Sequence, residues 1–133
     1  MTMPAGKYYI GDLCYVMHDA WDEFCQLTID GYACKDGEFV LGDGRRFATF
    51  GTAYGDGTYR SNIGTSHSVD AGLIGCILVT DIRDLTYDYD RILSLGAIVD
   101  FETPFEVSED QGLICFGHVQ IETADEEEYE EEA

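Results

Sequence analysis

The chain has 133 residues, the size of one ordinary domain, and carries seven lysine and arginine residues against 27 aspartate and glutamate residues. The formal net charge of -20 excludes direct binding to nucleic acid or to an anionic membrane, because both require a basic surface. Leu, Ile, Val and Phe number 33, about a quarter of the chain and enough for an acidic sequence to fold.

The sequence also predicts the compartment. The first residues lack the basic start and apolar stretch of a secretory signal. The longest apolar run, Leu73–Val79, is far shorter than the ~20 residues of a membrane-spanning helix. Five cysteines without a C-x-x-C pair are typical of reduced core thiols. We therefore expect a cytoplasmic protein.

The first elements in chain order are a strand and a helix. Lys7–Ile10 is rich in β-prone residues and predicts a strand. Asp19 can cap a short helix that runs through Gln26, in which Trp21, Phe24 and Cys25 form the apolar stripe.

Tight turns divide the middle of the chain into short strands. Asp-Gly pairs supply positive φ angles and favour a β-meander, and four are present: Asp30-Gly31, Asp36-Gly37, Asp43-Gly44 and Asp56-Gly57. The β-prone runs in this part are 38–41, 46–54, 58–61, 66–70 and 73–80. The last run is apolar on both faces, which predicts a central strand covered on both sides.

A second helix is expected over Asp84–Leu95, where apolar residues recur at helical spacing before Gly96, a residue typical of helix C-termini. The next segment alternates between two kinds of residue, as in a strand with one solvent-exposed face. The residues expected on its buried face are Phe101, Thr103, Phe105 and Val107.

A turn at 109–112 leads to a strand expected over 113–121. Its inward residues should be Leu113, Cys115, Gly117, Val119 and Ile121. The tail Asp125–Ala133 holds seven acidic residues in nine and is expected to be disordered. Without those seven charges the body still carries -13.

These elements predict one globular domain over residues 1–124, followed by the acidic tail. The fold class is all-β or β-dominant α+β: a single compact antiparallel sandwich or barrel with one or two short helices.

Three residues are the candidates for catalysis. Ser66-His67-Ser68-x-Asp70 brings a hydroxyl, an imidazole and a carboxylate together, but in a strand His67 points away from the other three. Asp12 interrupts two aromatic segments, either as a ligand-binding or acid/base group or as a carboxylate that accepts backbone N–H groups in a turn. A small hydrolase using Asp12 and Asp70, with His67 as the third candidate, is one hypothesis, and the sequence leans against an enzyme.

Cys14-x3-His18 and Cys115-x2-His118 form the one metal-like grouping. In a strand, Cys115 and His118 point to opposite faces, so we expect no metal and no cofactor.

Binding without catalysis is the leading hypothesis. Aromatic and polar residues suited to a binding surface are Tyr9, Tyr15, Tyr54, Asp56, Tyr59 and Arg60. Their partner would be a protein or a small ligand.

A DNA mimic is the alternative form of binding. Asp100, Glu102 and Glu106 would line one strand face at steps of roughly 6.6 Å, with Glu122 on the neighbouring strand. Such a row of carboxylates could stand in for phosphates in the groove of a nucleic-acid-binding protein.

Several segments resemble small uncharacterised proteins of phages and some bacteria: residues 6–16 (GKYYIGDLCYV) with Trp21, 54–59, 69–75, and Phe116-Gly117 before Ile121. Leu13 departs from the pattern, in which Pro is expected. The resemblance implies a compact β-rich fold and a phage or prophage setting, in the cytoplasm of a host cell. Because small phage proteins often bind and disable host machinery, it implies a host protein as partner, and it carries over no catalytic residue.

Overall fold

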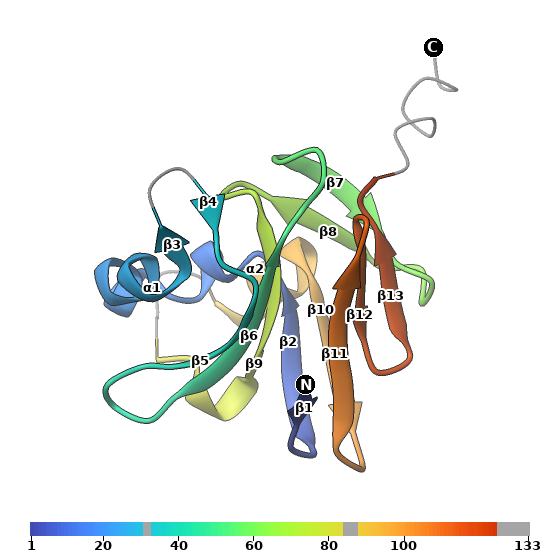
Figure 1. The fold of residues 1–133 in the computed structure, drawn as a ribbon. Coiled ribbons are helices and arrows are strands. Elements are labelled where there is room, and N and C mark those ends of the chain that lie inside the picture. Colours follow the sequence, from blue (N-terminus) through green and yellow to red (C-terminus); the bar gives the residue numbers. More distant parts are fainter. Residues whose placement is uncertain (31–32, 84–87, 125–133) are drawn as a thin grey trace.

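The computed structural model describes residues 1–30, 33–83 and 88–124, and strands dominate this part of the chain (Figure 1). A five-stranded antiparallel sheet has the order β10 (Ala97–Phe101), β2 (Gly6–Gly11), β9 (Leu73–Leu78), β6 (Arg46–Gly51), β5 (Gly37–Val40). A four-stranded sheet has the order β1 (Thr2–Met3), β11 (Phe105–Asp110), β12 (Leu113–Phe116), β13 (Val119–Glu122). Two hairpins are formed by β3 (Ile29–Asp30) with β4 (Ala33–Cys34), and by β7 (Gly57–Arg60) with β8 (Ser66–Val69). The predicted β-dominant α+β class is confirmed.

The five-stranded sheet is covered on both faces, and β9 is its middle strand. Alternate residues of β2 show the arrangement: Tyr8 and Ile10 belong to one apolar core, and Tyr9 belongs to the other. Five of the six residues of β9 are buried. The predicted central strand over this run is therefore confirmed.

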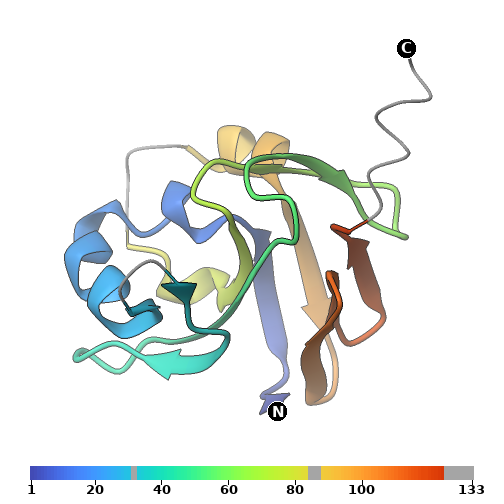
Figure 2. The ribbon, with the colours of Figure 1, turned by 45° about the horizontal axis from the view of Figure 1, so that its top comes forward.

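The first core lies between the two large sheets, which face each other in Figure 2. Tyr8 meets Phe101 and Phe105 edge-on, with ring centroids 5.9 and 5.0 Å apart, and its hydroxyl donates to the Pro4 carbonyl at 2.7 Å. These contacts join β2 to the end of β10 and the start of β11.

The second core lies on the other face, beneath α1 (Trp21–Thr28), which Figure 2 shows on the side away from β11–β13. Phe24 is fully buried and stacks between Trp21 and Phe47, at centroid distances of 4.7 and 4.9 Å. The expected apolar stripe of this helix is thus present. The expected cap is wrong: α1 follows a short 3-10 helix at 18–20, and the Asp19 carboxylate binds Arg45 instead of a backbone N–H.

The second helix, α2, spans Tyr89–Leu95. The Asp88 carboxylate accepts the Arg91 N–H at 2.9 Å and so caps it. Residues 84–87 of the expected helix lie outside the described residues. With eight and seven residues, neither α1 nor α2 is long enough to cross a membrane, and the described part of the chain has no helix that is.

The Asp-Gly pairs serve two purposes. Asp43-Gly44 forms the turn between β5 and β6, with a φ of +98° at Gly44, as predicted. Gly37 and Gly57 instead begin β5 and β7. The Asp30-Gly31 turn and the acidic tail lie outside the described residues.

The predicted continuous strand over 113–121 is wrong. A tight turn at Gly117 and His118, with a φ of +58° at Gly117, divides it into β12 and β13. Ile114 and Phe116 are therefore the buried residues of β12, while Leu113 and Cys115 are only partly buried. Val119 and Ile121 do face inward as expected.

The central sheet depends on the missing side chain of Gly75. A Cβ atom there would collide with the Ala48 carbonyl oxygen of β6 and with the Leu13 side chain. We expect Gly75→Ala to lower the free energy of unfolding by about 2–3 kcal/mol, as overpacking does. Urea denaturation measures this, with the exposed Ser66→Ala of β8 as the control. Equal stability of the two variants would contradict the constraint.

Candidate functional site

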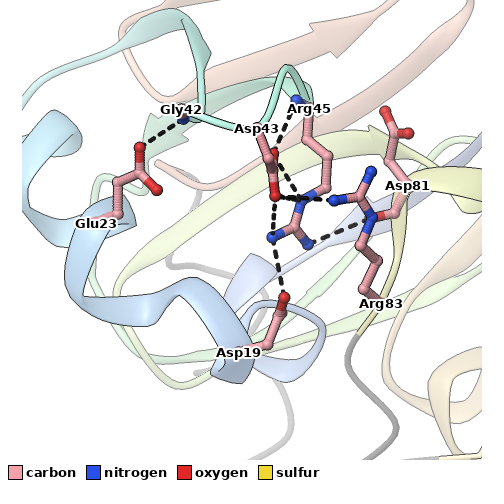
Figure 3. A network of polar contacts seen from close by, with 7 residues as sticks. All are labelled: Asp19, Glu23, Gly42, Asp43, Arg45, Asp81 and Arg83. Carbon is pink, nitrogen blue, oxygen red and sulfur yellow. Dashed lines mark hydrogen bonds and ion pairs between the residues drawn. The ribbon is translucent and has the colours of Figure 1, made fainter.

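A hollow of about 490 Å³ lies between α1 and the β5–β6 turn. Its centre is Arg45, whose side chain is only 3% exposed. Arg45 Nε donates to Asp43 at 3.0 Å, Nη2 donates to Asp19 at 2.9 Å, and Nη1 donates to the Asp81 carbonyl at 3.4 Å (Figure 3). Arg83 pairs with the same Asp43 carboxylate at 2.9 Å.

Charge pairing explains how this hollow tolerates a buried guanidinium. Burial alone would lower the pKa of Arg45, but Asp43 and Asp19 outweigh it and raise that pKa. The hydrogen bonds from Arg45 lower the pKa of Asp43 in turn. Glu23 of α1 accepts the Gly42 N–H at 2.6 Å (Figure 3). These side chains join the helix to the sheet, so we assign the network a structural role.

Two arginines that share Asp43 allow a matched test. We expect Arg45→Met to lower the free energy of unfolding by about 2–3 kcal/mol, because it leaves two carboxylates without their buried partner. Arg83 is 52% exposed, and Arg83→Met should cost less than about 1 kcal/mol. Urea denaturation of both variants decides the matter, and a larger loss for Arg83→Met would refute the assignment.

Asp12 is fully buried, and both of its oxygens are occupied. Oδ1 accepts the Cys14 N–H at 2.9 Å, and Oδ2 accepts the N–H groups of Asp70 and Ala71 at 2.7 and 2.6 Å. Burial raises the pKa of Asp12, and the three backbone donors oppose that rise. Of the two interpretations of this residue, the structure shows the backbone-bonding one: Asp12 ties the end of β2 to the β8–β9 turn.

His67 is also fully buried, while Ser66 is exposed, as the strand parity predicted. The Nδ1 atom of His67 lies 3.1 Å from the Ile10 carbonyl oxygen, and because a carbonyl only accepts, Nδ1 carries a proton. Asp70 is exposed and contributes only its backbone N–H to Asp12. The three candidate catalytic residues therefore share no pocket among the described hollows.

Burial lowers the pKa of His67 to about 4 from its ordinary 6.5. Between these values the unfolded chain binds a proton that the folded chain rejects, so stability is lost as the pH falls through this window. The loss should reach up to about 1.4 kcal/mol per pH unit. His67→Gln keeps an N–H donor for Ile10 and should flatten this dependence, whereas the raised pKa of Asp12 has the opposite sign and affects both proteins equally.

Denaturation of wild type and His67→Gln at a series of pH values isolates this contribution. If both lost stability equally between pH 6.5 and 4, the effect would belong to another group.

The predicted binding residues divide between core and surface. Tyr9 and Tyr59 are buried, and the Tyr59 hydroxyl donates to the Gly55 carbonyl at 2.9 Å. They belong to the core and are not available to a partner at the surface. Tyr15 is half-buried, whereas Tyr54, Asp56 and Arg60 are exposed. Arg60 and Glu122 line a second hollow of about 450 Å³ between β7 and β13.

The predicted acidic strand face takes a different form. Asp100 is the last residue but one of β10, Glu102 lies in the following turn, and Glu106 lies on β11 of the other sheet, so the three do not follow one strand. The chain turns at Glu102–Pro104, between β10 and β11. The alternation of apolar and charged residues over 101–107 predicted a single strand here and gave no sign of this turn. All three are exposed and surround a third hollow of about 430 Å³. Gly117 and His118 line it as well, and only the β12–β13 turn brings them there.

Within the part of the chain that the structure describes, no three His, Cys, Asp or Glu side chains are grouped so as to hold a metal ion. Comparison of the chain with protein-family models, with curated proteins and with solved structures finds no match to any of them.

Proposed function

We propose that the protein is a non-catalytic binding protein whose partner is a protein with a basic surface. The observation that supports this most directly is the distribution of charge. Arg45, Arg46 and Arg83 are consumed in ion pairs with carboxylates of the same chain. Among the residues that the structure describes, most carboxylates stay exposed, including Asp22, Asp36, Asp43, Asp56, Asp70, Asp88, Asp90, Asp100, Glu102, Glu106, Asp110 and Glu122.

Such a surface steers and orients a basic partner. Complementary potentials raise the association rate and suppress wrong partners, and their effect weakens with salt. The same field repels nucleic acid and anionic membranes. The resemblance to small phage proteins supports a host protein as the partner and the host cytoplasm as the place of binding.

The candidate catalytic residues support binding over catalysis. The Asp12 carboxylate and the His67 ring are buried and bonded to the backbone, so a substrate at the surface cannot reach them. Their burial counts against the small-hydrolase hypothesis.

DNA mimicry is the second candidate, and the hollow beside the β10–β11 turn favours it. Three exposed carboxylates from two sheets and a turn surround one depression. They do not form the regular single-strand row expected from the sequence, so the mimicry would depend on their arrangement around the hollow.

The test starts with the full-length protein immobilised in a host lysate at near-physiological salt. We expect a stoichiometric basic protein, released by stepwise salt and identified by mass spectrometry. The purified partner should then bind roughly tenfold more weakly at about 200 mM than at about 50 mM salt. Affinity that does not change with salt would overturn the proposal.

Competition separates the two forms of binding. If duplex DNA displaces the protein from its purified partner, the partner uses a nucleic-acid groove and the DNA-mimic form holds. If DNA has no effect while salt still weakens the complex, the basic surface lies elsewhere on the partner and the mimic form fails.

A further inference from the structure

The hollow beside the β10–β11 turn has an aromatic floor. Phe101 and Phe105 stack with ring centroids 3.7 Å apart, and the His118 ring lies 5.6 Å from that of Phe101. Gly117 covers Phe101 without a side chain: a Cβ atom there would lie 2.9 Å from a ring carbon of Phe101. Any larger residue would therefore collide with Phe101, so glycine is what allows the β12–β13 turn to pack against this ring.

Carboxylates form the rim of this hollow. Glu106 is already engaged, because the Met1 ammonium group lies 3.1 Å away and the Thr2 hydroxyl also donates to it. Lys7 stands opposite Asp100 in the β2–β10 register. Even so, no ion pair or hydrogen bond from the described residues is made to the carboxylates of Asp100 and Glu102.

We infer that this hollow binds an arginine side chain of the partner protein. The inference rests on the proposed function and names the group that the acidic surface recognises. The guanidinium would lie against the exposed His118 ring, meet only the small part of Phe101 that lines the hollow, and donate N–H groups to Asp100 and Glu102.

The chemistry of the hollow favours arginine over other side chains. A guanidinium is planar, stacks on aromatic rings and presents several N–H donors to carboxylates at once. A lysine ammonium has the charge but no plane to lie on the floor, and an anionic group would be repelled by the rim. The same chain holds Arg45 between Asp19 and Asp43 beside α1, where the carboxylates are already occupied.

The experiment uses the full chain and two synthetic dodecapeptides, one alternating arginine with serine and the other with lysine in place of arginine. Titration calorimetry gives the affinity, and amide NMR shifts locate the contact. The test variant is Asp100→Asn with Glu102→Gln. The control removes two charges outside the hollow, Asp90→Asn with Asp110→Asn, both at exposed positions. Circular dichroism verifies the fold of each variant.

We expect the arginine peptide to shift the amides of Gly117 and His118. The test variant should bind it at least about tenfold more weakly, and the control less than about threefold more weakly. The lysine peptide should bind wild type several-fold more weakly than the arginine peptide. Equal weakening by the two variants, equal binding of the two peptides, or shifts confined to other surfaces would each overturn the inference.

Binding of the purified partner protein to these variants distinguishes a failure of this inference from a failure of the proposed function. If it binds wild type and the Asp100, Glu102 variant equally well and remains salt-sensitive, the arginine site fails and the proposed function stands. If neither peptide nor any basic protein binds with salt-dependent affinity, both fail.

Discussion

The need to bury both faces of the five-stranded sheet governs the rest of this structure. β9 lies at its centre, so its residues must be apolar or small, and Gly75 lets Ala48 and Leu13 approach the backbone. One face is closed by the four-stranded sheet, and the other by α1 and the segments around it. The four-stranded sheet and α1 must both stay packed on the five-stranded sheet, because exposing either core would lose the hydrophobic stabilisation of that core.

Charged residues provide those attachments. Asp12 joins the end of β2 to the β8–β9 turn through three backbone N–H groups, and Arg45 joins the 3-10 helix before α1 to the β5–β6 turn. A buried charge is costly unless it is paired or hydrogen-bonded, so each of these groups is surrounded by partners. The residue that most suggested catalysis is therefore part of the scaffold.

Because Arg45, Arg46 and Arg83 are paired with carboxylates of the same chain, the surface is left with an excess of negative charge. The acidic groups around the β10–β11 turn lie where the two large sheets meet, over Phe101 and Phe105. The negative charge there would orient a basic partner and raise its rate of association. The aromatic side chains below would contact one side chain of that partner. This combination is what the proposed recognition of a basic partner depends on.

The sequence alone determined the β-dominant class, the central position of the 73–78 segment, the β5–β6 turn and the opposite orientations of His67 and Ser66, because apolar alternation and turn residues act locally. Only the tertiary structure decided the rest. The turn at Gly117 divides one expected strand into two. Asp19 does not cap the helix as expected, because its carboxylate accepts a hydrogen bond from Arg45, 26 positions away. The acidic hollow was likewise beyond prediction, since Asp100 and Glu106 belong to different sheets and His118 joins them through a turn. Contacts between residues distant in sequence depend on how the sheets pack, and no local pattern encodes that.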